Sequence, residues 1–294
     1  HAAGRRHGGR RTQRLGRVST PVRLLSGADA PDLRQLLATD PASYAMVSER
    51  ISLIGVGSGL GAEVWGWLPE GRLVSALYLG ANVVPIAAGD QAIADFAARA
   101  RQIPRRCSSI VGPSAAVLAF YEQVRAVWGD ARDVRPHQPM LLIAHPPAVP
   151  AHPDVRAATM DDLDALFPAS VAMFTEELGI SPLAADGGAA YRRRVASLIG
   201  QGRAFVLMDQ GEVVFKAEVG VVSQDVAQIQ GVWVHPGHRG QHLSEPGMAA
   251  VVDLTRRRFA PTVTLYVNDY NHAALATYHR VGFEQVGEFA TVLF

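Results

Sequence analysis

The stretch QIQGVWVHPGHRGQHLSEPGMAAVV, residues 228–252, changes character twice. It opens as an apolar, strand-like run, continues through a segment rich in glycine and charge, and ends as a helix predicted to begin near Ser244. A glycine-rich loop between a strand and a helix directs several backbone N–H groups to one place, and the helix N-terminus adds partial positive charge. The stretch therefore predicts a phosphate or pyrophosphate site. A plain connection, with Gly240 in a tight turn, is the alternative.

A second stretch near the C-terminus has the same order of strand, turn and helix. TVTLYVN at 262–268 has the β-branched and apolar content of a strand. Asn271 precedes HAALATYHRV, whose apolar residues recur at helical spacing, so a helix is predicted to begin there. Asn271 and Tyr278 are two turns apart and are expected on one face. FEQVGEFATVLF then predicts one or two final strands.

The sequence also contains an internal similarity between its first and second halves. PEGRLV at 69–74 matches DQGEVV at 209–214, each a turn between two predicted strands. SIVGPSAAVLAFYEQV at 109–124 matches YVNDYNHAALATYHRV at 266–281, each a strand followed by a helix. We interpret these matches as a degenerate repeat, with chance similarity of two α/β segments as the alternative.

A proline-rich segment separates the two copies. HPPAVPAHPD at 145–154 contains four prolines and predicts a stiff linker. We therefore expect a basic disordered tail at 1–17, a first domain at 18–144 and a second domain at 155–294. Each domain is predicted as a mixed, mostly antiparallel sheet flanked by helices. Thr159, with Asp162 at capping-box spacing, is expected to open the first helix of the second domain.

Composition limits the class of protein further. Hydrophobic residues make up 48% of the 294 residues, and the single cysteine, Cys107, excludes an intramolecular disulfide and a cysteine-rich metal site. No apolar run could span a bilayer and no signal peptide is recognisable, so we expect a cytoplasmic protein. Residues 1–17 hold six arginines and no acidic residue. We expect a solubilising tail there, with non-specific nucleic-acid binding as the weaker alternative.

Three segments together resemble the GNAT superfamily of N-acetyltransferases. VWVHPGHRGQHLS resembles the acetyl-CoA loop of that family, and VRAATMDDLDALFPA at 155–169 resembles its opening. NDYNHAALATYHRVGF resembles the helix motif Asn-x-x-Ala-x-x-x-Tyr-x-x-x-Gly-Phe, with matches at Asn271, Ala274, Tyr278, Gly282 and Phe283. The whole chain resembles an actinobacterial group that joins a domain of unknown function to a GNAT domain. The resemblance implies an α/β (α+β) fold with two GNAT-like domains in tandem, the first of them degenerate.

The resemblance also implies a reaction, which is direct transfer of acetyl from acetyl-CoA to a primary amine. Backbone N–H groups of Val232, Trp233 and Val234 would polarise the thioester carbonyl. Tyr278 would protonate the leaving thiolate and Asn271 would line the cofactor site. The pyrophosphate would lie against the loop residues Arg239, Gly240, Gln241, His242, Leu243 and Ser244. The acceptor, a small molecule or a protein amine, cannot be identified from the sequence. No metal is expected, since the spacing of His235, His238 and His242 in a turn does not suit one.

One loop residue departs from the family pattern. His242 replaces the usual glycine; its N–H can still donate if its φ is negative, but its side chain must point away, and it could even contact phosphate. The alternative to an enzyme is therefore a catalytically degenerate interaction or regulatory module with weak or no CoA binding. Glu218 is the first candidate for the general base, and Glu176 and Glu177 are others.

The first copy lacks the phosphate loop. Where the second copy has VHPGHRGQHLS, the first has AAGD, and Asp90 would cap the following helix and repel phosphate. We expect this copy to bind no CoA and instead to pack on the second copy or shape the acceptor site. The glycines of GVGSGLGAE at 55–63 precede a strand and predict only a flexible connection.

Overall fold

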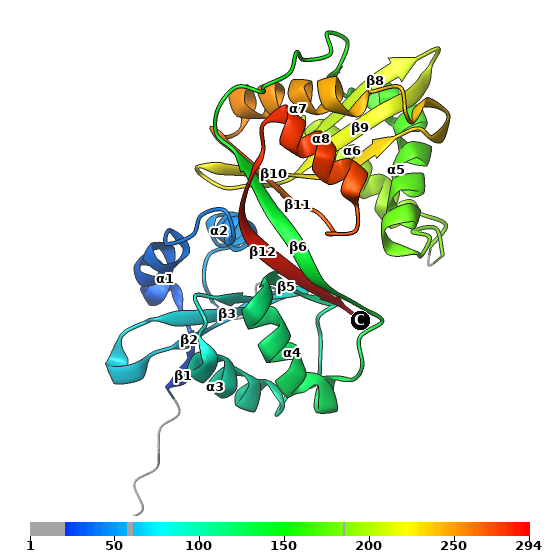
Figure 1. The fold of residues 1–294 in the computed structure, drawn as a ribbon. Helices are drawn as coiled ribbons and strands as arrows, with labels where there is room; N and C mark the ends of the chain where they lie inside the picture. The colour runs from blue at the N-terminus through cyan, green and yellow to red at the C-terminus, as the bar shows by residue number, and fades with distance from the viewer. Residues whose placement is uncertain (1–20, 58–60, 185) are drawn as a thin grey trace, which may run out of the picture.

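Twelve strands form one continuous sheet in the order β1-β2-β3-β4-β5-β12-β6-β11-β10-β9-β8-β7 (Figure 1). The computed structural model describes residues 21–57, 61–184 and 186–294. The predicted tail at 1–17 and part of the glycine-rich segment at 55–63 lie outside the described residues. No helix in the described ranges is both long enough and apolar enough to cross a membrane.

The two halves of the chain repeat the same order of strands and α-helices. The first half contains β1 (Val22–Leu24), η1 (Gly27–Asp29), α1 (Ala30–Leu37), α2 (Ala45–Ile54), β2 (Glu63–Trp67), η2 (Pro69–Gly71), β3 (Ser75–Leu79), β4 (Asn82–Ile86), α3 (Asp90–Ala100), β5 (Ser109–Pro113), α4 (Ser114–Trp128) and β6 (Asp133–Ile143). The second half contains β7 (Arg156–Ala157), η3 (Met160–Asp162), α5 (Leu163–Leu178), α6 (Ala189–Gly200), β8 (Ala204–Asp209), β9 (Glu212–Val222), β10 (Val226–Val234), η4 (Pro236–His238), α7 (Ser244–Arg258), β11 (Thr262–Tyr266), α8 (His272–Val281) and β12 (Glu284–Leu293). The predicted tandem α/β fold is therefore confirmed.

Local backbone geometry repeats as well. The turn between β2 and β3 places Glu70 and Gly71 at positive φ, and the turn between β8 and β9 does the same with Gln210 and Gly211. Both turns thus use the left-handed conformation that twisted hairpins favour. The PEG and DQG matches in the sequence mark this shared geometry.

Each half also opens with the same capped turn. Arg23 forms an ion pair with Asp29, and Arg156 forms one with Asp162 at the equivalent place. Asp162 completes the predicted capping box with Thr159, and Asp29 forms the same box in the first half. In each case the arginine holds the pKa of the aspartate well below its usual range. The six-residue spacing from arginine to aspartate is a repeat signal that our sequence comparison missed.

The last strand of each half lies in the part of the sheet formed by the other half. β12 pairs antiparallel with β5, and β6 pairs antiparallel with β11. β6 and β12 also pair with each other, from Glu284 opposite Leu142 to Leu293 opposite Asp133. Figure 1 shows these two strands running between the halves. The linker at 145–154 has no helix or strand, but the sheet does not end there.

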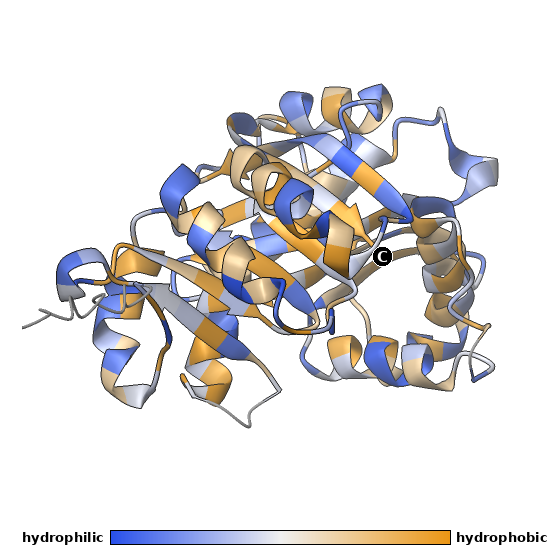
Figure 2. Ribbon diagram, turned by 90° about the horizontal axis from the view of Figure 1, so that it is seen from below, coloured by the Kyte–Doolittle hydropathy of each residue, from blue (hydrophilic) through white to orange (hydrophobic). Residues whose placement is uncertain are grey.

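The exchanged strands also contribute to the hydrophobic cores. Ala290 and Val292 of β12 are buried in the core under α3 and α4 of the first half. Leu141 and Ile143 of β6 are buried in the core under α7 and α8 of the second half. Figure 2 shows hydrophobic residues concentrated along the strands, whereas hydrophobic and hydrophilic residues alternate along the helices. Arg203 and Glu49, 2.8 Å apart, form a further, largely buried link between the halves.

This exchange predicts that neither half folds alone. A fragment of residues 155–294 would expose the edge of β11 and leave β12 without β5 and β6, so we expect it to unfold or aggregate. Co-expression with residues 1–154 should restore a soluble complex with one cooperative thermal transition, measured by circular dichroism. The control is the intact chain cut after folding within 145–154, whose pieces should stay associated. A monomeric 155–294 fragment with the melting temperature of the intact protein would contradict the prediction.

Candidate functional site

The decisive feature of the site is a β-bulge in β10. Gln230 pairs with Glu218 of β9, whereas Trp233 pairs with Lys216, so two residues, Gly231 and Val232, face one residue of the partner strand. Gly231 has a φ of 59°, which glycine adopts without strain. A bulge of this kind interrupts the ladder and leaves main-chain groups unpaired. It lies where the sequence predicted the N–H groups of Val232, Trp233 and Val234 to act.

The neighbouring strand leaves room beside this bulge. β10 pairs in parallel with β11 only from Val226 to Gln228, opposite Thr262 to Thr264. Beyond Gln228, β10 has no ladder partner on that side among the described residues. The main-chain groups at the bulge are therefore available to a ligand entering between the two strands.

A buried ion pair holds the bulge in place. Lys216, the only lysine of the chain, is 1% exposed. Its Nζ lies 3.2 Å from Glu218 Oε2 and donates to the carbonyl oxygen of Gly231 at 3.0 Å. Glu218 also accepts a hydrogen bond from Gln230 Nε2 at 2.8 Å. Burial opposes ionisation of Glu218, but Lys216, Gln230 and Arg194 outweigh it and lower its pKa.

We predict that Lys216→Met lowers the free energy of unfolding by about 3–5 kcal/mol, because it leaves Glu218 charged and buried without its partner. The measurement is denaturant unfolding at pH 8. The loss should shrink toward about pH 5, since without Lys216 the pKa of Glu218 rises in the folded state and protonation removes the unpaired charge. The matched control is Arg194→Met, which removes a half-exposed cation 3.8 Å from the same carboxylate and should cost about 1 kcal/mol or less. Equal losses in the two variants would contradict this role of Lys216.

The predicted phosphate loop runs from His235 to the start of α7 at Ser244. Leu243 is the N-cap residue of α7, and no side chain caps the helix there. Within the described chain, the N–H groups of residues 240–245 make no hydrogen bond. These donors, at a helix N-terminus, form an arrangement suited to an anion. Glu245 in the first turn is paired with Arg280 at 2.5 Å, so its charge is compensated.

His242 adopts a positive φ of 57°, and Gly240 has a φ of 76°. The condition of a negative φ at His242 is therefore not met. The loop requires the left-handed conformation here, which glycine adopts freely and histidine only at some cost. His242 is exposed, so its side chain does not fill the loop. His242 thus adopts a backbone conformation that glycine favours.

Arg239 is held by two contacts at the end of β10. Its Nη2 lies 2.7 Å from Glu176 Oε2, and its Nε donates to the carbonyl oxygen of Val234 at 3.1 Å. Glu176 also accepts a hydrogen bond from Trp233 Nε1 at 3.2 Å. Because Glu176 is occupied in these contacts, it is the weakest of the three candidate bases.

Tyr278 lies in α8 and is 7% exposed. Its ring packs edge-on against Phe283, with the ring centres 5.9 Å apart. Burial, followed by the charge of Glu177, raises the pKa of Tyr278 well above its usual range. The hydroxyl therefore stays protonated at neutral pH and can donate. Asn271 lies just before α8 as its N-cap residue and accepts a hydrogen bond from Ala274 N, so its side chain already has a structural role.

Glu177, near the end of α5, differs from Glu218 in its electrostatics. Surrounding protein raises its pKa, although the residue is exposed to solvent. Its charge in turn raises the pKa values of Tyr266 and Tyr191 as well as that of Tyr278. A carboxylate with a raised pKa is a better proton acceptor near neutral pH than one whose pKa is lowered.

The first half has no equivalent of the loop. Only residues 87–89 connect β4 to α3, and the N–H of Ala87 donates to Tyr44 Oη at 2.8 Å. The N-cap of α3 is Gly89, not Asp90, which is the first residue of the helix and makes no capping hydrogen bond. The expected side-chain cap is therefore wrong, because the helix begins one residue earlier than a cap at Asp90 requires. In place of a phosphate loop, the structure has this three-residue connection.

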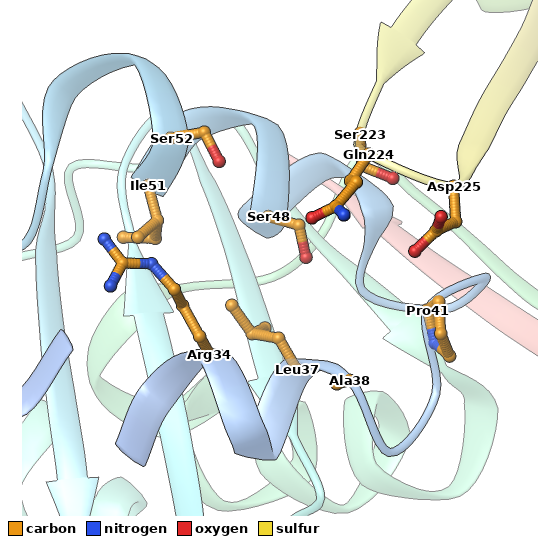
Figure 3. A pocket seen from close by; sticks show the side chains of 10 residues that line it. All are labelled: Arg34, Leu37, Ala38, Pro41, Ser48, Ile51, Ser52, Ser223, Gln224 and Asp225. Carbon is orange, nitrogen blue, oxygen red and sulfur yellow. The ribbon is translucent and has the colours of Figure 1, made fainter. Parts of the chain in front are cut away.

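Two cavities lie between the halves, one on each side of α2. The larger, about 160 Å³, is far from the bulge and lies between α1, α2 and the turn after β9, with Arg34 and Asp225 at opposite ends (Figure 3). The other, about 120 Å³, lies beside the bulge and is lined by residues of α2, β4, β5, β9, β10, β11 and β12. The cavity beside the bulge is thus lined by both halves of the chain.

Two family models match successive parts of the chain. Residues 167–283 match the model of the Acetyltransferase (GNAT) family, and residues 62–166 match the Domain of unknown function (DUF4081). The chain therefore carries a C-terminal domain of the GNAT family, preceded by a domain of unknown function. The comparison with curated proteins finds no match.

Solved structures with this fold span nearly the whole chain. A Drosophila protein has a TM-score of 0.62 at 14% identity, with 94% of this chain and 99% of that one covered. A tandem GNAT protein from the clavulanic acid biosynthesis pathway has a TM-score of 0.56 at 17% identity, covering 92% and 98%. A GNAT-family acetyltransferase from Colwellia psychrerythraea has a TM-score of 0.56 at 12% identity, covering 93% and 99%. These likenesses support the fold.

Proposed function

We propose that the chain is an acetyl-CoA-dependent N-acetyltransferase that transfers acetyl directly to a primary amine. The observation that carries this proposal is the bulge at Gly231–Val232, followed on the same strand by a loop and a helix N-terminus with free N–H groups. The bulge suits a thioester carbonyl, and the loop suits a pyrophosphate. When bound, acetyl-CoA supplies the activated acetyl group.

The protein groups have distinct roles in this proposal. Backbone N–H groups of Val232, Trp233 and Val234 polarise the carbonyl. The N–H groups of Gly240, Gln241, His242, Leu243 and Ser244 hold the pyrophosphate, and Arg239 reaches it after leaving Glu176. Asn271 fixes the start of α8 beside the cofactor.

Proton movement balances the reaction. The amine nitrogen bonds to the acetyl carbon and the carbon–sulfur bond breaks. Glu177 takes the first proton from the ammonium group of the acceptor, directly or through water. Tyr278 donates its hydrogen to the departing sulfur and takes up the second proton lost by the amine nitrogen, directly or through water, so that no free phenolate forms on a group of raised pKa. Glu218, with its lowered pKa, stays ionised and stabilises the ammonium form of the acceptor; as a proton acceptor it is second to Glu177.

One observation favours the second candidate, a regulatory or interaction module of degenerate GNAT fold. The left-handed His242 costs energy at a position where glycine would not. The module would bind acetyl-CoA weakly or not at all and would release no thiol with any amine. The unchanged backbone conformation of the loop favours the enzyme.

The enzyme proposal predicts amine-dependent release of CoA thiol at saturating acetyl-CoA, followed with a thiol reagent across a panel of primary amines. Tyr278→Phe should lower kcat by roughly 10²-fold, because it removes the donor to the leaving sulfur. Glu177→Gln should lower kcat. It should also abolish the increase of kcat with pH, because we attribute that increase to deprotonation of Glu177, whose pKa is raised.

The control for these variants is Tyr270→Phe, an exposed tyrosine outside the site, which should leave kcat unchanged. A Tyr278→Phe enzyme with the native kcat would remove Tyr278 from the mechanism. If the rise of kcat with pH persisted in Glu177→Gln and disappeared in Glu218→Gln, Glu218 would be the base.

A further inference from the structure

The cavity of about 120 Å³ beside the bulge is built by both halves. Met46 and Val47 of α2, with Val84 and Val111 of β4 and β5, form its wall on the first half. Tyr266 of β11 and Phe289 of β12 are among the residues on the other side, with their ring centres 5.2 Å apart. We call this cavity the side-chain pocket.

Two lining residues connect the pocket to the reaction centre. Gln230 lines the pocket, donates to Glu218 at 2.8 Å and directly precedes Gly231 of the bulge. Tyr266 also lines the pocket, and it lies on β11 two residues beyond Thr264, the last residue of β11 that pairs with β10, so it flanks the opening beside the bulge. An amine placed at the bulge would therefore have its substituent at the mouth of the pocket.

The lining chemistry excludes an ionised substituent. None of the residues that line the pocket is charged; they are Ser43, Met46, Val47, Asn82, Val84, Val111, Gly112, Val221, Gln228, Gln230, Tyr266 and Phe289. A second charge on the acceptor would lose its hydration there without gaining a partner. Gln228 is only 9% exposed, and its side-chain amide makes no hydrogen bond to any described residue, so this amide can serve one neutral polar group of the ligand.

The volume sets the size of the substituent. An apolar cavity of about 150 Å³ accepts benzene, so a pocket of about 120 Å³ suits a branched chain of about four carbon atoms. We propose that the side-chain pocket holds the neutral, branched alkyl group of the acceptor, which is an α-amine of leucine-like size next to an uncharged carbonyl or amide. This inference rests on the proposed acetyltransferase function and names its substrate class.

The pocket also indicates a role for the first half of the chain. It has no phosphate loop of its own, yet α2, β4 and β5 supply one wall of the acceptor site. The half without a cofactor site thereby determines which amine the other half uses.

The test compares amino acid amides as acceptors of the full chain at saturating acetyl-CoA. Leucinamide should exceed glycinamide in kcat/KM by at least about tenfold, since each buried carbon contributes roughly fourfold. Lysinamide, with its second charge, should be no better than glycinamide. Val111→Phe fills the pocket and should reduce the leucinamide-to-glycinamide ratio to about one.

A matched control makes the same change on the surface. Val127→Phe, in α4, alters a residue that is 53% exposed and should leave the ratio unchanged. Met46→Ala enlarges the pocket instead and should shift the preference from leucinamide toward phenylalaninamide, which tests the pocket if Val111→Phe fails to fold. A native ratio near one, or a ratio that neither pocket variant changes, would overturn the proposal.

A binding measurement separates this inference from the proposed function. Fluorine NMR with trifluoroleucinamide reports occupancy of the pocket without any acetyl transfer. Binding that Val111→Phe abolishes and Val127→Phe preserves, in a protein that acetylates no amine, would support the pocket while removing the enzyme proposal. Acetylation of glycinamide with no binding of the fluorinated probe would support the enzyme and overturn the pocket.

Discussion

The antiparallel pairing of β6 and β12 is the constraint on which the rest of the molecule depends. Each strand lies between two strands of the other half, because β12 pairs with β5 and β6 and β6 pairs with β12 and β11, so both are required to close both parts of the sheet. Their side chains complete the two cores in the same exchanged manner. The geometry of β10 and β11, and with it the opening beside the bulge, is thereby fixed to the first half. Rigid placement of a site by extended strands is more accurate than placement by loops alone.

The two halves of the chain, which share this sheet, differ at the connection between the fourth strand and the helix that follows it. The second copy keeps a bulge, a long loop and an uncapped helix N-terminus, whereas the first connects the same elements through three residues and donates Ala87 N–H to Tyr44. The buried Lys216–Glu218 pair lies under the bulge and binds the carbonyl oxygen of Gly231. A buried pair of this kind contributes little net stability but defines one geometry, and here it defines the orientation of the bulge.

The sequence predicted local features well. The loop ahead of Ser244, the capping box of Thr159 and Asp162, and the paired turns at Gly71 and Gly211 all leave signals within a few residues. The strand exchange leaves no such signal, because a strand has the same period whichever neighbour it pairs with. The linker prolines correctly indicated a break in secondary structure but could not show that the sheet continues past it.

Contacts between residues far apart in the chain could likewise not be predicted from the sequence. The pairing of Arg239 with Glu176 joins residues 63 positions apart, and the positive φ of His242 follows from the loop as a whole. The electrostatic difference between Glu177 and Glu218 depends on Lys216 and on burial. No single-residue pattern could therefore have ranked these two carboxylates as bases.

The central claim is that one half alone holds acetyl-CoA and that its loop is functional despite His242. Calorimetric titration of the full chain with acetyl-CoA tests this most directly, beside a His242→Gly variant. The account predicts one site per chain, with an affinity that changes only a few-fold in the variant because the loop already has the glycine conformation. Two sites per chain, or binding that appears only in His242→Gly, would contradict it.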